Sequence, residues 1–88
     1  METQERMMNI VRDFIVEDAL HGQGDELTFQ TPLLQWGIID SLQMLSLVAF
    51  IEHRFSVKLP DASINAKNFQ TIESVVSLIS SIEQLPPG

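Results

Sequence analysis

Asp40 and Ser41 form a polar pair inside the otherwise apolar stretch GIIDSLQML, which runs from Gly37 to Leu45. A serine hydroxyl can attack a substrate, be modified by another enzyme, or bond the free backbone groups at a helix start. Aspartate is itself a preferred helix cap, which stabilises by about 1 kcal/mol. We therefore expect Asp40 to cap the following helix. Ser41 then takes the first helical position, with its hydroxyl free and pointing outward.

Catalysis by Ser41 would need a nearby base and an oxyanion hole. The sequence has two histidines. His53 is twelve residues further along the same predicted helix. At 1.5 Å per residue it lies about 18 Å from Ser41, which is too far for it to act as the base. His21 has no acidic partner at a recognisable spacing, and the G-x-S-x-G elbow is absent. We expect no enzymatic activity.

Metal and phosphate sites are not indicated either. The sequence contains no cysteine, which excludes disulfides and thiolate metal ligands. The acids show neither metal-ligand spacing nor a calcium-loop pattern. The GQG that follows His21 is too short for a phosphate loop and follows a predicted helix. We predict no metal site.

Length and charge restrict the class of protein further. The 88 residues begin with methionine and suit one domain, 1–88, with a flexible tail at 84–88. The net charge of −7 opposes binding to nucleic acid and to anionic membrane surfaces, although it serves solubility equally well. The sequence has neither a membrane-span-length apolar run nor a secretory signal, so we expect a cytoplasmic protein.

Three segments carry apolar residues at helical spacing. The first runs from Thr3 to Leu20 and ends at His21-Gly22, and the second runs from about Ser41 to Phe55. The third follows Thr71, a predicted cap, and places apolar residues at Ile72, Val75, Val76, Ile79 and Ile82. No strand pattern competes. The segment from Ala62 to Asn68 can hold at most a short helix. The prediction is an all-α four-helix bundle of three main helices and one short one.

The connection between the first two helices is long, about twenty residues. It contains seven large apolar residues, so we expect an ordered loop that lies against the helices. Thr31-Pro32 could cap and open one helical turn that Gly37 closes. We expect Trp36 to pack this loop onto the bundle. Lining a path to Ser41 is the alternative.

The second predicted helix has two apolar strips. Its core face is expected to consist of Met44, Leu47, Val48, Ile51 and Phe55. A narrower strip beside Ser41 consists of Leu42, Leu45 and Ala49. One helix in a small protein need not bury both strips. The second is therefore a candidate contact surface, with ordinary core packing as the alternative.

The sequence resembles the acyl carrier and peptidyl carrier protein superfamily. The resemblance lies in Gly37 followed by Asp40-Ser41-Leu42, in LSLVAFIEHRFSVKLPD and in NFQTIESVVSLI, and it covers nearly the whole chain. The Asp-Ser-Leu triplet alone is weakly specific. Its position in an acidic, helical chain of this size, with the later Phe and Pro-Asp in order, makes the match specific.

The resemblance implies that Ser41 carries a 4′-phosphopantetheine arm, transferred from coenzyme A by a phosphopantetheinyl transferase. The arm's thiol would hold an acyl or aminoacyl group as a thioester. Asp40 matches the aspartate before the modified serine, and the resemblance implies that it also assists the transferase. The implied partner-binding residues are Leu42, Leu45, Ser46, Ala49, Glu52 and His53.

Two departures from the superfamily's usual pattern bear on the cargo. Two isoleucines, rather than one residue, separate Gly37 from Asp40, a form that looks like free-standing aminoacyl carriers. The helix after Ser41 is also poorer in acids than that of fatty-acid carriers. Both features favour an aminoacyl or peptidyl carrier, which partners recognise more through apolar contact than through charge.

We therefore expect a monomeric, discrete carrier of specialised metabolism, such as nonribosomal peptide or antibiotic biosynthesis. An adenylate-forming ligase would load it, and tailoring or acyl-transfer enzymes would receive its cargo. A pathway that oxidises a loaded amino acid such as proline is compatible with the residues but is not specified by them. The alternatives are a polyketide or fatty-acyl carrier, a cofactor-free helical adaptor, and an enzyme that uses Ser41 directly.

Overall fold

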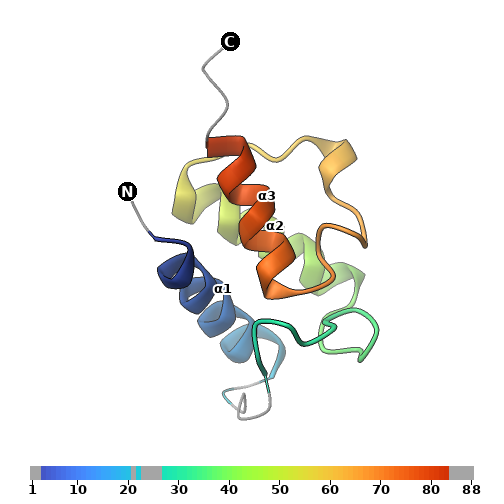
Figure 1. The fold of residues 1–88 in the computed structure, drawn as a ribbon. Helices are drawn as coiled ribbons and strands as arrows, with labels where there is room; N and C mark the ends of the chain where they lie inside the picture. The colour runs from blue at the N-terminus through green and yellow to red at the C-terminus, as the bar shows by residue number, and fades with distance from the viewer. Residues whose placement is uncertain (1–2, 21, 23–26, 84–88) are drawn as a thin grey trace.

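A computed structural model describes residues 3–20, 22 and 27–83 (Figure 1). These residues form the α-helices α1 (Gln4–Ala19), α2 (Ser41–Phe55) and α3 (Ile72–Glu83), and the short 3₁₀ helix η1 (Asp61–Ser63). The described part of the chain contains no strand, so the all-α prediction is confirmed. The predictions for His21 and for the tail at 84–88 lie outside the described residues.

Helix α1 begins and ends at local features of the sequence. The Thr3 side chain accepts a hydrogen bond from the Arg6 N–H at 3.1 Å and so caps the helix. Beyond its end, Gly22 has a φ of +85°, and its N–H donates to the Val16 carbonyl at 2.8 Å. That left-handed conformation suits glycine and confirms its predicted role at the end of the helix.

The core lies where the apolar faces of the three helices meet. Helix α1 packs against both α3 and α2, and the Phe14 and Phe50 rings stack with centroids 4.2 Å apart. Loop residues complete the core. The buried apolar residues are Met7, Val11, Ile15, Leu27, Leu33, Ile39, Leu47, Val48, Ile51, Phe55, Leu59, Phe69, Ile72, Val75, Val76 and Ile79.

Helix α2 has the predicted bounds and two-sided character. Of its predicted core face, Leu47, Val48, Ile51 and Phe55 are buried and Met44 is half-buried. The strip beside Ser41 remains in contact with water, since all three of its residues are exposed. Core packing, the alternative interpretation of that strip, is therefore wrong.

The predicted short helix between Ala62 and Asn68 is not confirmed, and the nearest element is the three-residue η1. The Asn65 carboxamide oxygen accepts from the Asn68 N–H at 2.9 Å, which is the bond of a helix cap. The Asn68 side chain, however, donates to the Ser63 carbonyl at 2.9 Å, and a helix would use that carbonyl for its own backbone bond. This local bond competes with helix formation. The described bundle has three α-helices.

The described part of the long loop, from residue 27, is ordered against the helices as predicted. Arg12 on α1 donates from Nε to the Leu27 carbonyl at 3.0 Å. The Trp36 N–H donates to the Pro32 carbonyl at 3.0 Å, and Gly37 closes this turn with a φ of +71°. The Thr31 hydroxyl, expected to cap the turn, instead accepts from the Thr28 N–H at 2.8 Å.

The expectation that Trp36 packs this loop onto the bundle is wrong, because 64% of its side chain is exposed. Leu33 and Ile39 fill the core positions of the loop instead, with 0% and 3% of their side chains exposed. Their backbones are joined by a hydrogen bond from the Ile39 N–H to the Leu33 carbonyl. The indole is left on the outside of the turn that they enclose.

Candidate functional site

The start of α2 is held by two reciprocal hydrogen bonds. An Asp40 carboxylate oxygen accepts from the Gln43 N–H at 2.9 Å, and the Gln43 side-chain oxygen accepts from the Asp40 N–H at 3.1 Å. Together these bonds form a capping box. The prediction that Asp40 caps the helix is confirmed. Sequence reasoning missed the part played by Gln43, although the Asp-Ser-Leu-Gln spacing is that of the motif.

Ser41 is the first residue of α2, and its side chain is exposed. Asp40 and Gln43 make the capping bonds, so the Ser41 hydroxyl takes no part in them. The N-terminus of a helix carries a partial positive charge and unpaired N–H groups, which favour a nearby phosphate. The position therefore fits a serine that bears a phosphodiester and remains open to another protein's active site.

Three large apolar residues close to Ser41 in the sequence are exposed. Trp36, Leu42 and Leu45 are the exposed large hydrophobic residues of the described chain, with exposed fractions of 64%, 76% and 58%. All three lie within ten residues of sequence around Ser41. We call them the apolar rim. Exposed apolar residues are typical of binding surfaces when they form a patch, so the apolar rim is a candidate contact region.

The other predicted partner-binding residues lie further along α2. Ser46, Ala49 and His53 are exposed. Glu52 is half-buried, and its carboxylate accepts a hydrogen bond from the Leu59 N–H at 2.9 Å. That bond ties the end of α2 to the segment that follows it, so Glu52 already has a structural contact. The predicted set is thus brought onto one helix, but its members differ in how available they are.

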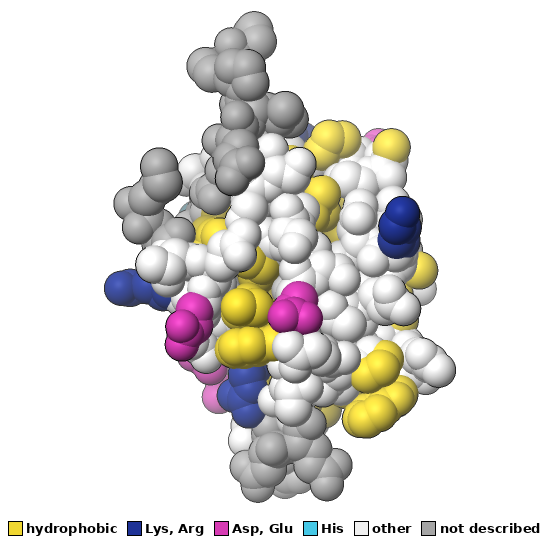
Figure 2. All heavy atoms as spheres, viewed as in Figure 1, with side chains coloured by type: hydrophobic (Ala, Val, Ile, Leu, Met, Phe, Trp, Pro, Cys, Tyr) yellow, Lys and Arg dark blue, Asp and Glu magenta, His cyan; other side chains and the backbone are white. Residues whose placement is uncertain are grey.

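On the face seen in Figure 2, hydrophobic side chains reach the surface in several separate groups, with acidic and basic side chains between them. Among the described residues, no cluster of histidine, aspartate and glutamate could hold a metal ion. None of the helices in the described ranges is both long and apolar enough to cross a bilayer.

The capping box leads to a prediction about stability. Replacing Asp40 by alanine removes the acceptor for the Gln43 N–H and should lower the free energy of unfolding by about 1 kcal/mol. Asp40→Asn keeps an acceptor of the same shape and should cost clearly less. Urea unfolding followed by circular dichroism measures both variants. Equal losses for the two variants would contradict the assigned cap.

Comparisons with known proteins agree with this geometry. The family described as "Phosphopantetheine attachment site" matches residues 14–79, a span that includes Ser41. The "Probable acyl carrier protein PigG" of Serratia sp. is 33% identical over 72 residues, which cover 82% of this chain and 83% of the relative. The "D-alanyl carrier protein" of Streptococcus suis is 23% identical over 77 residues, covering 88% and 90% of the two chains.

A solved structure is also similar. A chain in the structure described as "Crystal structure of FAD-dependent dehydrogenase" is 40% identical, with a TM-score of 0.72. The match covers 78% of this chain and 97% of that chain. The family match spans most of this chain, and the alignment with PigG covers most of both chains. This chain therefore belongs to the acyl carrier and peptidyl carrier protein superfamily, whose members hold 4′-phosphopantetheine covalently on a serine.

Proposed function

We propose that Ser41 is the serine that bears the phosphopantetheine arm, and that this chain presents an activated acyl or aminoacyl group to partner enzymes. The proposal is supported by the exposure of Ser41 at the first position of α2. The start of this helix is already capped by Asp40 and Gln43, so the Ser41 hydroxyl is not needed there. The arm supplies a thiol that holds the cargo as a thioester. The protein itself supplies attachment and presentation.

The residues near Ser41 have separate tasks in this proposal. The backbone N–H groups and dipole at the start of α2 favour the negative charge of the phosphodiester. The Asp40–Gln43 capping box fixes the helix start, so the modified position has a defined direction. A transferase that delivers the arm from coenzyme A needs to reach only one exposed hydroxyl.

We assign partner recognition to the apolar rim and to the exposed residues that continue along α2, namely Ser46, Ala49 and His53. Tryptophan and leucine bury large apolar areas when a partner covers them, and tryptophan is enriched among energetically dominant contact residues. Glu52 contributes by holding the Leu59 segment in place. Acidic side chains are sparse on this surface, so contacts should depend on apolar burial more than on charge.

We infer that the cargo is an aminoacyl group, loaded by an adenylate-forming ligase. The D-alanyl carrier proteins among the relatives support an amino acid as cargo. The 40%-identical chain supports a later oxidation. The match covers nearly all of that chain but only part of this one, so that chain is the shorter of the two. A chain of that size is far too small to be a dinucleotide-binding dehydrogenase itself. It is therefore a small chain in a structure that is named for a dehydrogenase. A flavin-dependent dehydrogenase is accordingly the partner class that we propose after loading.

Mass spectrometry separates the main alternatives. The unmodified protein is incubated with coenzyme A and a broad-specificity phosphopantetheinyl transferase and then weighed. We expect a gain of one arm, whereas a cofactor-free adaptor would gain nothing. The product is next offered to ligases for amino acids and for fatty acids. Loading by the fatty-acid ligase alone would favour the fatty-acyl alternative over our proposal.

The apolar rim leads to a prediction about docking. Leu45→Glu places a charge where a partner would bury the leucine, and glutamate is a good helix former on an exposed position. We expect unchanged helicity and a roughly tenfold loss in the transferase's kcat/KM, equivalent to about 1.4 kcal/mol. Ser77→Glu, on the exposed surface of α3, is the matched control and should behave as wild type. Unfolding of the Leu45 variant by circular dichroism would contradict the assignment of this face.

A further inference from the structure

The exposed face of α2 changes character along its length. It begins beside Ser41 with the apolar side chains Leu42 and Leu45. It ends in the last turn with two exposed basic side chains, His53 and Arg54. His53 is eleven residues beyond Leu42, which is about three helical turns, so the two lie on the same side of the helix. A partner that covers the apolar rim therefore meets His53 at the far end of the same face.

The segment after α2 adds a lysine to this end of the helix. Glu52 is the one acidic residue of α2, and it is half-buried, with its carboxylate accepting from the Leu59 N–H at 2.9 Å. Leu59 is itself buried. Consecutive Cα atoms are about 3.8 Å apart, so this bond also holds the backbone of the exposed Lys58 beside the last turns of α2. We call His53, Arg54 and Lys58 the basic end.

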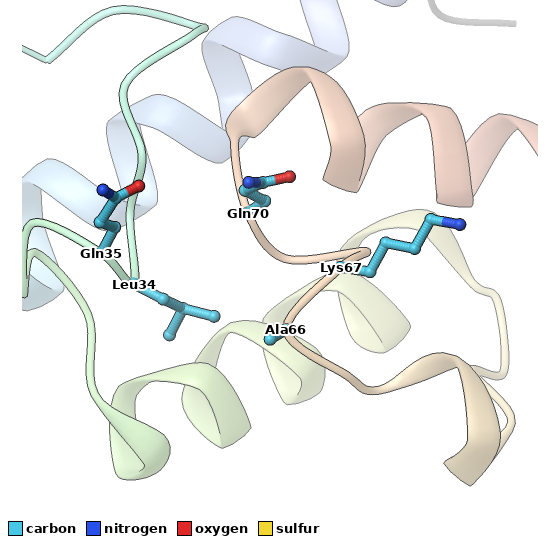
Figure 3. A pocket seen from close by; sticks show the side chains of 5 residues that line it. All are labelled: Leu34, Gln35, Ala66, Lys67 and Gln70. Carbon is cyan, nitrogen blue, oxygen red and sulfur yellow. The ribbon is translucent and has the colours of Figure 1, made fainter.

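The basic end contrasts with the charge of the whole chain. The sequence has twelve acidic residues and only five lysines and arginines. Two of those five, Arg6 and Arg12, lie on α1. A third, Lys67, lies in the segment before α3 at the edge of a pocket, and its amino group points away from Leu34 across that pocket (Figure 3). The other two belong to the basic end, so positive charge is concentrated there in an otherwise acidic protein.

Local stability accounts for part of the basic end. The helix dipole favours cations in the last turn of a helix, which explains His53 and Arg54. The Arg54 guanidinium also lies 5.4 Å from the centroid of the Phe55 ring, a cation–π contact. The dipole's effect falls off within the last turn, however, and Lys58 is three residues beyond Phe55, where α2 ends. Lys58 is therefore the member of the basic end that best tests a role in binding.

We propose that the adenylate-forming ligase that loads the carrier covers the apolar rim and the basic end together and places carboxylates opposite the basic end, an inference that rests on the proposed function. Leu42 and His53 are about 17 Å apart along the helix axis at 1.5 Å per residue. A standard interface buries roughly 800 Å² on each partner, a disc about 32 Å across, so one enzyme can cover both. Burial of the rim supplies affinity. Opposite charges at the other end steer the encounter and fix which way round the enzyme docks.

A series of charges at Lys58 tests this inference. The protein with the arm is offered to the amino-acid ligase that loads it in the assay above, and kcat/KM for the carrier is measured at low ionic strength. We expect Lys58→Arg to behave as the wild type, Lys58→Gln to lose about threefold and Lys58→Glu about tenfold, because each step weakens the attraction by one charge. These differences should largely vanish in about 0.5 M salt, where the screening length is about 4 Å.

The matched control is Arg6→Glu, which changes the net charge as much as Lys58→Glu does but at an exposed position near the start of α1. It should be loaded as the wild type is. If Lys58→Glu does not fold by circular dichroism, Lys58→Gln decides alone. An unchanged or faster reaction of the Lys58 variants, or an equal loss for Arg6→Glu, would overturn the inference. If the wild type gains no arm, or no amino-acid ligase loads it, the proposed function itself is contradicted.

Discussion

Ser41→Ala should abolish attachment of the phosphopantetheine arm and leave the fold intact. The transferase needs a hydroxyl at this position, and alanine supplies none. Ser41 is exposed and the capping bonds belong to Asp40 and Gln43, so its loss should change the free energy of unfolding by no more than about 0.5 kcal/mol. Intact mass after incubation with coenzyme A and transferase measures attachment, and urea unfolding measures stability.

Ser77→Ala is the matched control for this experiment. Ser77 is also an exposed serine, but it lies on α3 and is not among the proposed partner-binding residues. The Ser77→Ala variant should gain one arm as the wild type does. An arm on Ser41→Ala, or its absence from Ser77→Ala, would place the attachment elsewhere than proposed.

Ile51→Ala should have the largest effect on stability. Ile51 is 0% exposed and belongs to the core face of α2. Truncating a fully buried isoleucine removes apolar contacts and leaves a cavity, which costs about 2–5 kcal/mol. The total free energy of unfolding of a small domain is about 5–15 kcal/mol. The variant should therefore unfold at much lower urea concentration and be partly unfolded at elevated temperature.

Leu42→Ala controls for leucine-sized truncation on the same helix. Leu42 is 76% exposed, so its truncation should change the free energy of unfolding by no more than about 0.5 kcal/mol. Urea unfolding followed by circular dichroism gives both values under one set of conditions. A smaller loss for Ile51→Ala than for Leu42→Ala would mean that the two faces of α2 are assigned the wrong way round.

The helices could be predicted from sequence because their information is local. Asp40 in front of an apolar run predicts where α2 begins, and the structure has α2 at Ser41–Phe55. Thr71 was expected to cap the third helix, and its hydroxyl accepts from the Ser74 N–H at 3.0 Å. The division of α2 into a buried and an exposed strip follows from its 3.6-residue period, because only one strip can face a small core.

The long loop and the segment before α3 could not be predicted in the same way, because distant partners decide their conformation. Trp36 was expected inside, yet Leu33 and Ile39 occupy the available core positions. The short helix expected between Ala62 and Asn68 is not confirmed, and the nearest helical element is η1 (Asp61–Ser63). In each case composition indicates an apolar or helical segment, but only the tertiary arrangement decides which side chain is buried.

The proposed site divides along the same line. Ser41 and its cap can be predicted from neighbouring residues. The contact between the loop before α2 and the segment before α3 cannot, because the two are far apart in the sequence and are joined by the Leu33–Gln70 backbone bond. No spacing in the sequence indicates that bond.

The proposed function depends most on which hydroxyl bears the arm. Fragmentation mass spectrometry of the protein purified from its native source would locate the arm directly, along with any cargo. We predict a single phosphopantetheine on Ser41, in a fragment separable from those that contain Ser46. An arm on any other residue, or an entirely unmodified protein from cells that contain an active transferase, would contradict the account.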